Sequence, residues 1–156
     1  MALDNELKLV PPIEQLRTPK KNNSAFQTDL CVFEKKRDLF IPRVVMEFKG
    51  GITTHDVLTY SAKARKHKQA YPYLRHGIIC SELASIPGRV FAHNEAVDFC
   101  AAIKDYRDER LNEFLRAFLK TEVASSRQLE RIGFGKARAY LFRTEVIVKK
   151  VGSGIT

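Results

Sequence analysis

The sequence has no long apolar run. None of its stretches is long and apolar enough for a signal peptide or a membrane span, which predicts a cytoplasmic protein without a membrane partner. Cysteine is scarce as well. Cys31, Cys80 and Cys100 are too few and too far apart for a disulfide framework or a CxxC metal clip, so we expect buried, reduced thiols. Low-complexity tracts are also absent, which argues against a disordered chain.

Acidic residues are outnumbered by basic ones. The chain has 18 aspartates and glutamates against 27 lysines and arginines, a formal net charge of +9. This surplus favours a polyanionic partner, because phosphate neutralisation releases counterions, but charge alone does not separate DNA from RNA or from an anionic membrane. With 156 residues, the chain is expected to form one domain over 1–156, either a whole protein or the catalytic domain of a larger one.

Apolar periodicity and turn-forming residues predict an α/β domain. Strands are expected at about 26–34 and 41–49, joined by the charged turn 35–38 into an antiparallel hairpin. A helix capped by Thr53 or Thr54 runs to about Ala70, and the strand 77–80 after it is expected to lie parallel to the strand before it. Further helices are predicted over 4–10, 13–17, 94–103 and around 111–119, and a last strand over 140–150.

The residues suited to chemistry lie in the predicted hairpin. Asp29 is near the start of an apolar strand, where a buried carboxylate is costly unless it is paired or bound to a cation. Alternation along the second strand sends Glu47 and Lys49 to the same face. Two carboxylates on adjacent strands suit Mg²⁺, and Lys49 suits a place beside an attacking water in phosphodiester hydrolysis. The structural alternative is that Asp29 lies at the solvent-exposed start of a strand and that Glu47 forms an ion pair with Lys49 or Arg43 on an exposed face.

The segments Thr28-Asp29 and Glu47-Phe48-Lys49, with a helix after them, resemble the motif of the PD-(D/E)XK nuclease superfamily. That family includes many type II restriction endonucleases and the archaeal Holliday junction resolvases. Threonine stands here in place of the family's proline. The resemblance covers about residues 10–82 and implies a restriction-endonuclease-like core, with a central mixed β-sheet flanked by helices. The catalytic residues it implies are Asp29, Glu47, Lys49 and Glu14, with Glu6 as the alternative to Glu14. The metal it implies is Mg²⁺, for which Mn²⁺ can substitute, bound by Asp29, Glu47 and Phe48.

Basic and aromatic side chains after the motif are candidates for DNA contacts. Four cations gather on the predicted helix with no acid among them, at positions 63, 65, 66 and 68. Solvated helix surface is the ordinary explanation of such a run, but this helix directly follows the proposed catalytic strand, so we expect some of its charges to face phosphates. The predicted DNA-binding residues are Lys63, Lys66, Tyr60, His67 and, at the hairpin tip, Lys36.

Together these features predict a Mg²⁺-dependent endodeoxyribonuclease that leaves 5′-phosphate and 3′-hydroxyl ends. The resemblance favours a restriction endonuclease or its catalytic domain, acting on double-stranded DNA. A Holliday junction resolvase is the first alternative, and a basic DNA-binding module without catalytic activity is the alternative from another class. A homodimer is expected because two strands must be cut, and a separate recognition domain or subunit is a further possible partner.

Overall fold

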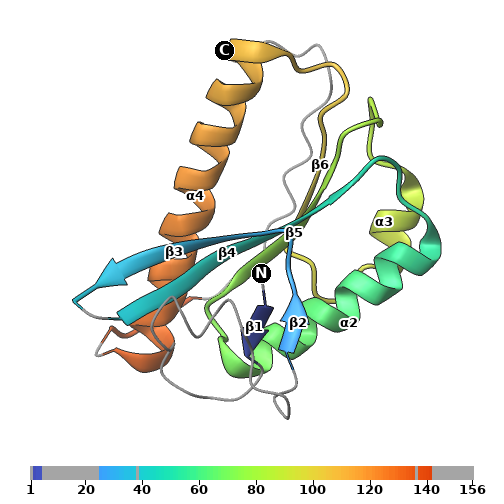
Figure 1. Cartoon of the computed structure of the whole chain (residues 1–156). Coiled ribbons are helices and arrows are strands. Elements are labelled where there is room, and N and C mark those ends of the chain that lie inside the picture. Colours follow the sequence, from blue (N-terminus) through green and yellow to red (C-terminus); the bar gives the residue numbers. More distant parts are fainter. Residues whose placement is uncertain (1, 5–24, 38, 136, 142–156) are drawn as a thin grey trace.

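A computed structural model of the chain describes residues 2–4, 25–37, 39–135 and 137–141. It has the predicted α/β architecture, a four-stranded mixed sheet with helices on both faces (Figure 1). The elements of this layered core are, in chain order, β3 (Leu30–Lys36), β4 (Leu39–Lys49), α2 (Thr54–Ala70), β5 (Arg75–Cys80), α3 (Gly88–His93), β6 (Phe99–Ala102) and α4 (Asp108–Phe134). A small antiparallel pair, β1 (Ala2–Asp4) with β2 (Ala25–Gln27), lies next to α2.

The strand order of the main sheet is β3-β4-β5-β6. The antiparallel pairing of β3 with β4 confirms the predicted hairpin, and its turn places Arg37 in the left-handed region at φ 56°. β5 lies parallel to β4, as predicted, and β6 lies parallel to β5. The carboxyl ends of β4, β5 and β6 therefore meet at one edge of the sheet, where Glu47 and Lys49 are found.

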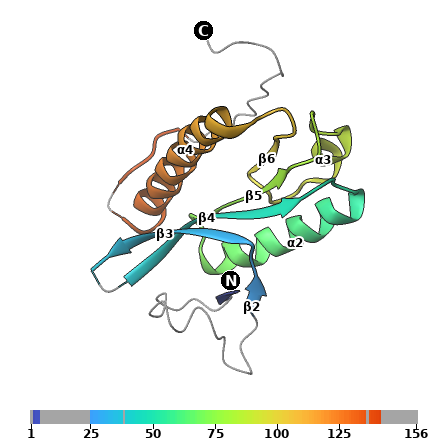
Figure 2. The ribbon, with the colours of Figure 1, turned by 45° about the horizontal axis from the view of Figure 1, so that its top comes forward.

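The central strand β4 sends its side chains alternately into two cores. Val45 packs with Ala70 and its neighbours at the end of α2, whereas Val44 and Met46 pack against Leu119 on α4. Figure 2 shows the two layers, with α4 on one face of the sheet and α2 on the other. This alternation is what places Glu47 and Lys49 on the α2 side.

A capping box fixes the start of α2. The Thr53 hydroxyl accepts a hydrogen bond from the Asp56 amide at 3.1 Å, and the Asp56 carboxylate accepts one from the Thr53 amide at 2.8 Å. Such reciprocal bonds satisfy two backbone donors that a helix start leaves unpaired. The predicted helix from Thr53 or Thr54 to Ala70 is confirmed.

The last described helix, α4, carries the predicted apolar stripe. Leu119 and Val123 pack on the sheet, and the Phe118 ring lies edge-on to Phe99 with ring centroids 4.7 Å apart. Gly135 ends the helix, where a Cβ would lie 2.4 Å from the Arg131 carbonyl oxygen. None of the described helices is both long and apolar enough to cross a membrane.

The helix predicted over 94–103 is wrong. The structure has the short helix α3 before it and the strand β6 within it. The Asn94 side chain accepts a hydrogen bond from the Val97 amide at 2.9 Å and donates one to the Val97 carbonyl at 2.8 Å. Such local bonds compete with helix formation. The ring of Phe99 then packs against Gly77 of β5, where a Cβ would lie 2.0 Å from the ring.

The predicted strand 26–34 is also wrong in one respect that matters for the site. It is two strands, and Thr28 and Asp29 form a bend between β2 and β3. Asp29 is exposed there rather than buried in a strand.

Several predictions fall outside the described residues. The predicted helix 13–17, with Glu14, and residues 5–10 of the predicted helix 4–10, with Glu6, lie there, while Asp4 itself ends β1. Residues 142–150 of the predicted last strand also lie there, and Tyr140 and Leu141 before them are not in a strand.

Candidate functional site

The two motif carboxylates lie at the same end of the hairpin, Glu47 on β4 and Asp29 in the bend directly before β3. The bend before β3 turns Asp29 toward β4, where its Oδ2 accepts a hydrogen bond of 2.8 Å from the Phe48 amide. Phe48 is the residue between Glu47 and Lys49, so this bond ties the first half of the motif directly to the second. Within the described part of the chain, its other oxygen, Oδ1, makes no hydrogen bond or ion pair and can take a further partner.

Glu47 is a buried carboxylate at the end of β4, with only 2% of its surface exposed. Burial raises its pKa, and the negative charge of Asp29 adds to this effect, which places the two carboxylates within electrostatic reach of each other. Lys63 of α2 opposes the shift, with its Nζ 2.5 Å from Glu47 Oε1. The structural alternative holds for Asp29, which is exposed directly before β3, but not for Glu47, which is buried and pairs with Lys63 instead of Lys49 or Arg43. Arg43 pairs instead with Glu34 and Glu130.

Lys49 is held by the start of α2. Its Nζ lies 3.2 Å from Asp56 Oδ1, and the other oxygen of Asp56 belongs to the capping box. The hydrogen bond that Lys49 donates to the Asp56 carboxylate raises the pKa of Lys49, and the Tyr60 phenol adds to the effect. Lys49 therefore remains an ammonium at neutral pH. It can donate hydrogen bonds to a water or a phosphate, but it cannot act as the base that removes a proton.

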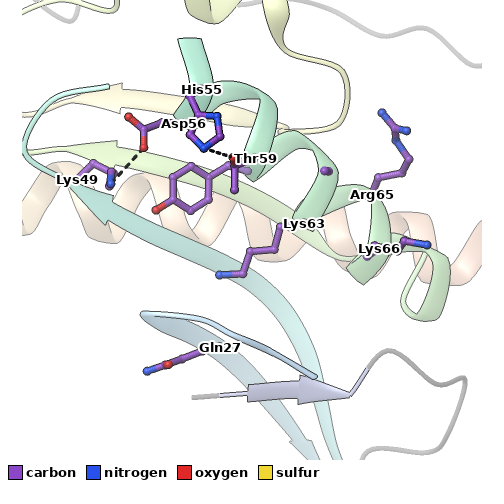
Figure 3. A pocket seen from close by; sticks show the side chains of 10 residues that line it. Gln27, Lys49, His55, Asp56, Thr59, Lys63, Arg65 and Lys66 are labelled. Carbon is purple, nitrogen blue, oxygen red and sulfur yellow. Dashed lines mark hydrogen bonds and ion pairs between the residues drawn. The ribbon is translucent and has the colours of Figure 1, made fainter. Parts of the chain in front are cut away.

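An open cleft of about 780 Å³ lies beside these residues, between α2 and the end of β2 (Figure 3). Lys49 and Lys63 point into it, and Gln27 of β2 lies opposite α2. The residues that line the cleft are Gln27, Lys49, His55, Asp56, Thr59, Tyr60, Ala62, Lys63, Arg65 and Lys66. Its lining includes four cations and one carboxylate, so the cleft suits an anion.

The basic residues of α2 differ in what they already bind. Arg65 pairs with Glu95, and Lys68 pairs with Asp98 at 2.7 Å. Lys63 pairs with Glu47, as described above. Lys66 is exposed and makes no ion pair with any described residue, so its charge is available to a partner.

His67 is not on the DNA-facing surface that the sequence predicts for it. The structure buries it completely, next to the equally buried His76 of β5, with ring centroids 5.3 Å apart. Burial lowers the pKa of His67 to about 4 and that of His76 to about 3, so both rings are neutral at pH 7. His76 lies directly beneath the site, with Nε2 3.9 Å from Glu47 Oε1.

The remaining predicted residues lie apart from this group or outside the described chain. Lys36 is exposed at the far end of the hairpin, about 20 Å along the strand from Asp29. Glu14, the fourth predicted catalytic residue, lies outside the described residues, as does its alternative Glu6. The structure thus brings together Asp29, Glu47, Phe48, Lys49, Tyr60 and Lys63, with Lys66 on the rim of the cleft.

The donor atoms present fit a hard divalent cation such as Mg²⁺. Asp29 and Glu47 offer carboxylate oxygens, and Phe48 can offer only its backbone carbonyl. Within the described part of the chain there is no cluster of three or more histidine, cysteine or acidic side chains for a metal. Two carboxylates suit Mg²⁺, which keeps several of its own waters, better than they suit Zn²⁺. The buried Oε1 of Glu47 lies 2.5 Å from the Lys63 ammonium, so it is a place where positive charge is stabilised.

Two residues of the site could not be recognised in the sequence. Asp56 is visible as a capping acid, but its bond to Lys49 depends on the tight turn at Gly50-Gly51. Gln27 enters from β2, and only the bend at Thr28 and Asp29 brings it to the cleft. Neither the contact of Asp56 with Lys49 nor the place of Gln27 in the cleft can be inferred until the path of these turns is known.

We compared the chain with protein-family models and with curated proteins, and nothing matched.

Proposed function

We propose that this chain is a divalent-cation-dependent endodeoxyribonuclease of the PD-(D/E)XK type, which hydrolyses DNA to 5′-phosphate and 3′-hydroxyl ends. The observation that carries the proposal is the bond between the Asp29 carboxylate and the Phe48 amide. It joins the bend that carries Asp29 to the strand β4 that carries Glu47 and Lys49, and Lys49 in turn lines a basic cleft.

The carboxylates of Asp29 and Glu47, with the carbonyl of Phe48, would hold Mg²⁺ or Mn²⁺. When bound, such a cation would polarise a phosphate oxygen and lower the pKa of a coordinated water, which would supply a nucleophile at neutral pH. Lys49 stays protonated, because Asp56 raises its pKa, and it donates hydrogen bonds to the attacking water or to the charge that develops on the phosphate. Asp56 orients Lys49 through the ion pair at the start of α2.

The cleft supports a nucleic-acid substrate. Lys66 has no acidic partner among the described residues and is free to bind a backbone phosphate, and Tyr60 lies between the two site lysines, with Lys49 Nζ 6.0 Å and Lys63 Nζ 5.8 Å from its ring centroid. Contacts of these lysines with DNA would be to backbone phosphates, so they would contribute affinity without sequence preference. We propose duplex DNA as the substrate of a cytoplasmic restriction-type enzyme, or of its catalytic domain with a separate recognition domain or subunit. A homodimer would cut both strands.

Cleavage assays test this function directly. The purified protein is incubated with supercoiled plasmid, linear duplex and a four-way junction, each with Mg²⁺ and with EDTA. We expect cutting of duplex DNA that needs Mg²⁺ and is lost in Asp29→Ala and in Glu47→Ala. Glu113→Ala removes an exposed acid from α4 and is the matched control, which should cut like the parent.

Each other outcome has a definite meaning. Preference for the four-way junction would identify a junction resolvase instead of a restriction-type enzyme. DNA binding without cleavage of any substrate, unaffected by Mg²⁺ or by the loss of Asp29, would identify a binding module and refute the proposed activity. Equal cutting by Glu47→Ala and the parent would remove Glu47 from the mechanism.

A further inference from the structure

Lys63 is shared between the buried carboxylate and the cleft. Its Nζ lies 2.5 Å from Glu47 Oε1, where its side chain is 15% exposed and that of Glu47 is 3% exposed. An ionised carboxylate at such a depth is costly without a counter-charge. In this structure, Lys63 supplies that counter-charge.

The same lysine lines the cleft. It lies one helical turn before Lys66, on the side of α2 that Figure 3 shows facing Gln27. Its ammonium carries a single positive charge, so it cannot fully neutralise both Glu47 and a DNA phosphate at once. The two anions therefore compete for Lys63, whereas Lys66 has no such competitor among the described residues.

We propose that Lys63 exchanges partners and thereby links cation binding to DNA binding. Without a divalent cation Lys63 neutralises Glu47. When a divalent cation takes its place beside Glu47 and Asp29, Lys63 turns to a backbone phosphate in the cleft. This inference rests on the proposed function, because it takes the same two carboxylates as the cation ligands. Linkage requires the effect to be mutual, so DNA must raise the affinity for the cation by the same factor.

The first test removes the charge of Glu47 without any metal. In EDTA, Glu47→Gln releases Lys63 from its carboxylate, and we expect the affinity for a short fluorescent duplex to rise about fivefold or more, the lower end of ordinary coupling between two sites. Loss of a negative charge near DNA would strengthen binding in any case. The substitution is therefore repeated in a Lys63→Gln background, where only that general effect remains. The rise in the parent background must exceed the rise in the Lys63→Gln background, and equal rises would overturn the exchange.

The second test measures the cation in the absence of DNA. In Lys63→Gln, a neutral hydrogen-bond donor replaces the ammonium beside Glu47. Calorimetry should therefore show a higher affinity for Mn²⁺ in this variant than in the parent. Lys66→Gln is the matched control on the next helical turn. Lys66→Gln should weaken DNA binding and leave Mn²⁺ affinity unchanged. The exchange also predicts that Ca²⁺, at constant ionic strength, tightens DNA binding by the parent. Lys66→Gln should keep this tightening, whereas Lys63→Gln should lose it. Thermal melts of each variant check that it is folded, and unchanged Mn²⁺ affinity in folded Lys63→Gln would overturn the exchange.

The outcomes separate this inference from the proposed activity. Cleavage of DNA with no difference between the two Glu47→Gln backgrounds would refute the exchange and leave the nuclease intact. A clear difference without cleavage of any substrate would refute the nuclease and leave the exchange intact. Failure of every form to bind DNA would overturn both.

Discussion

Acidification should destabilise this fold through the two buried histidines. His67 and His76 are both fully buried, and burial lowers their pKa values to about 4 and about 3, with positive neighbours adding to the effect. In the unfolded chain a histidine has a pKa of about 6.5. Below pH 6.5 the unfolded state therefore binds protons that the folded state does not, and the free energy of unfolding must fall as the pH falls.

The size of the effect follows from these values. Between pH 7.5 and 5.5, linkage gives a loss of about 1.35 kcal/mol for each histidine and about 2.7 kcal/mol for the pair. For a chain of this length, such a loss lowers the melting temperature by roughly 5–10 °C. Glu47 acts in the opposite direction, because burial raises its pKa and the folded state then takes up a proton before the unfolded state does. Ordinary carboxylates remain ionised across this window, so they do not obscure the histidines.

Urea denaturation at pH 7.5, 6.5 and 5.5 measures the effect as a slope. His67→Phe and His76→Phe should each reduce the loss on acidification by about half, whatever they do to stability at pH 7.5. His93→Phe, at an exposed position at the end of α3, is the control and should keep the slope of the parent. Because Glu47 can offset part of the loss in the parent, the comparison with the variants is decisive, and the reasoning is refuted if both buried variants keep the parent's slope.

Three further predictions concern α2 and the sheet. Lys66→Ala should weaken binding to every duplex and reduce the slope of log K against log salt by about 0.9; an unchanged slope in anisotropy titrations would mean that α2 does not face DNA. Arg43 is 3% exposed and bridges carboxylates of β3 and α4, so Arg43→Ala should cost roughly 3 kcal/mol in urea denaturation. If Arg43→Ala lowered the free energy of unfolding by less than an ordinary surface substitution does, the ion pairs of Arg43 with Glu34 and Glu130 would be contradicted. Gly77→Ala would drive a Cβ into the Phe99 ring and should cost roughly 1–3 kcal/mol. Gly88→Ala meets no atom within 4 Å and is its control, so equal stability of these two variants would contradict the packing of β5 on β6.

Much of the sheet could be predicted because its signals are local. The two-residue alternation of β4, the charged turn before it and the capping residue Thr53 each specify structure over a few residues. β6 could not be predicted in this way. Residues 94–103 have a composition that suits a helix, and the strand forms because Gly77 leaves room for Phe99 on the neighbouring strand.

The candidate site was predictable in its residue types but not in its contacts. Alternation placed Glu47 and Lys49 on one face, and the structure agrees. Their partners come from α2, and which of its lysines reaches Glu47 depends on how the helix lies on the sheet. His67 was misplaced for a related reason. The buried side of α2 includes Ser61 and His67 besides Val57 and Ala64, so it has no continuous apolar stripe to identify it.

The anchor of Asp29 has a consequence for how the motif can be altered. Its partner is the backbone amide of Phe48, and any residue except proline supplies that amide. Side chains at positions 47, 48 and 49 can therefore be exchanged singly while the donor that positions the other acid is retained. The motif is in this sense modular. A substitution at one of these positions, natural or engineered, can therefore remove or replace one functional group and still retain the hydrogen bond that positions Asp29.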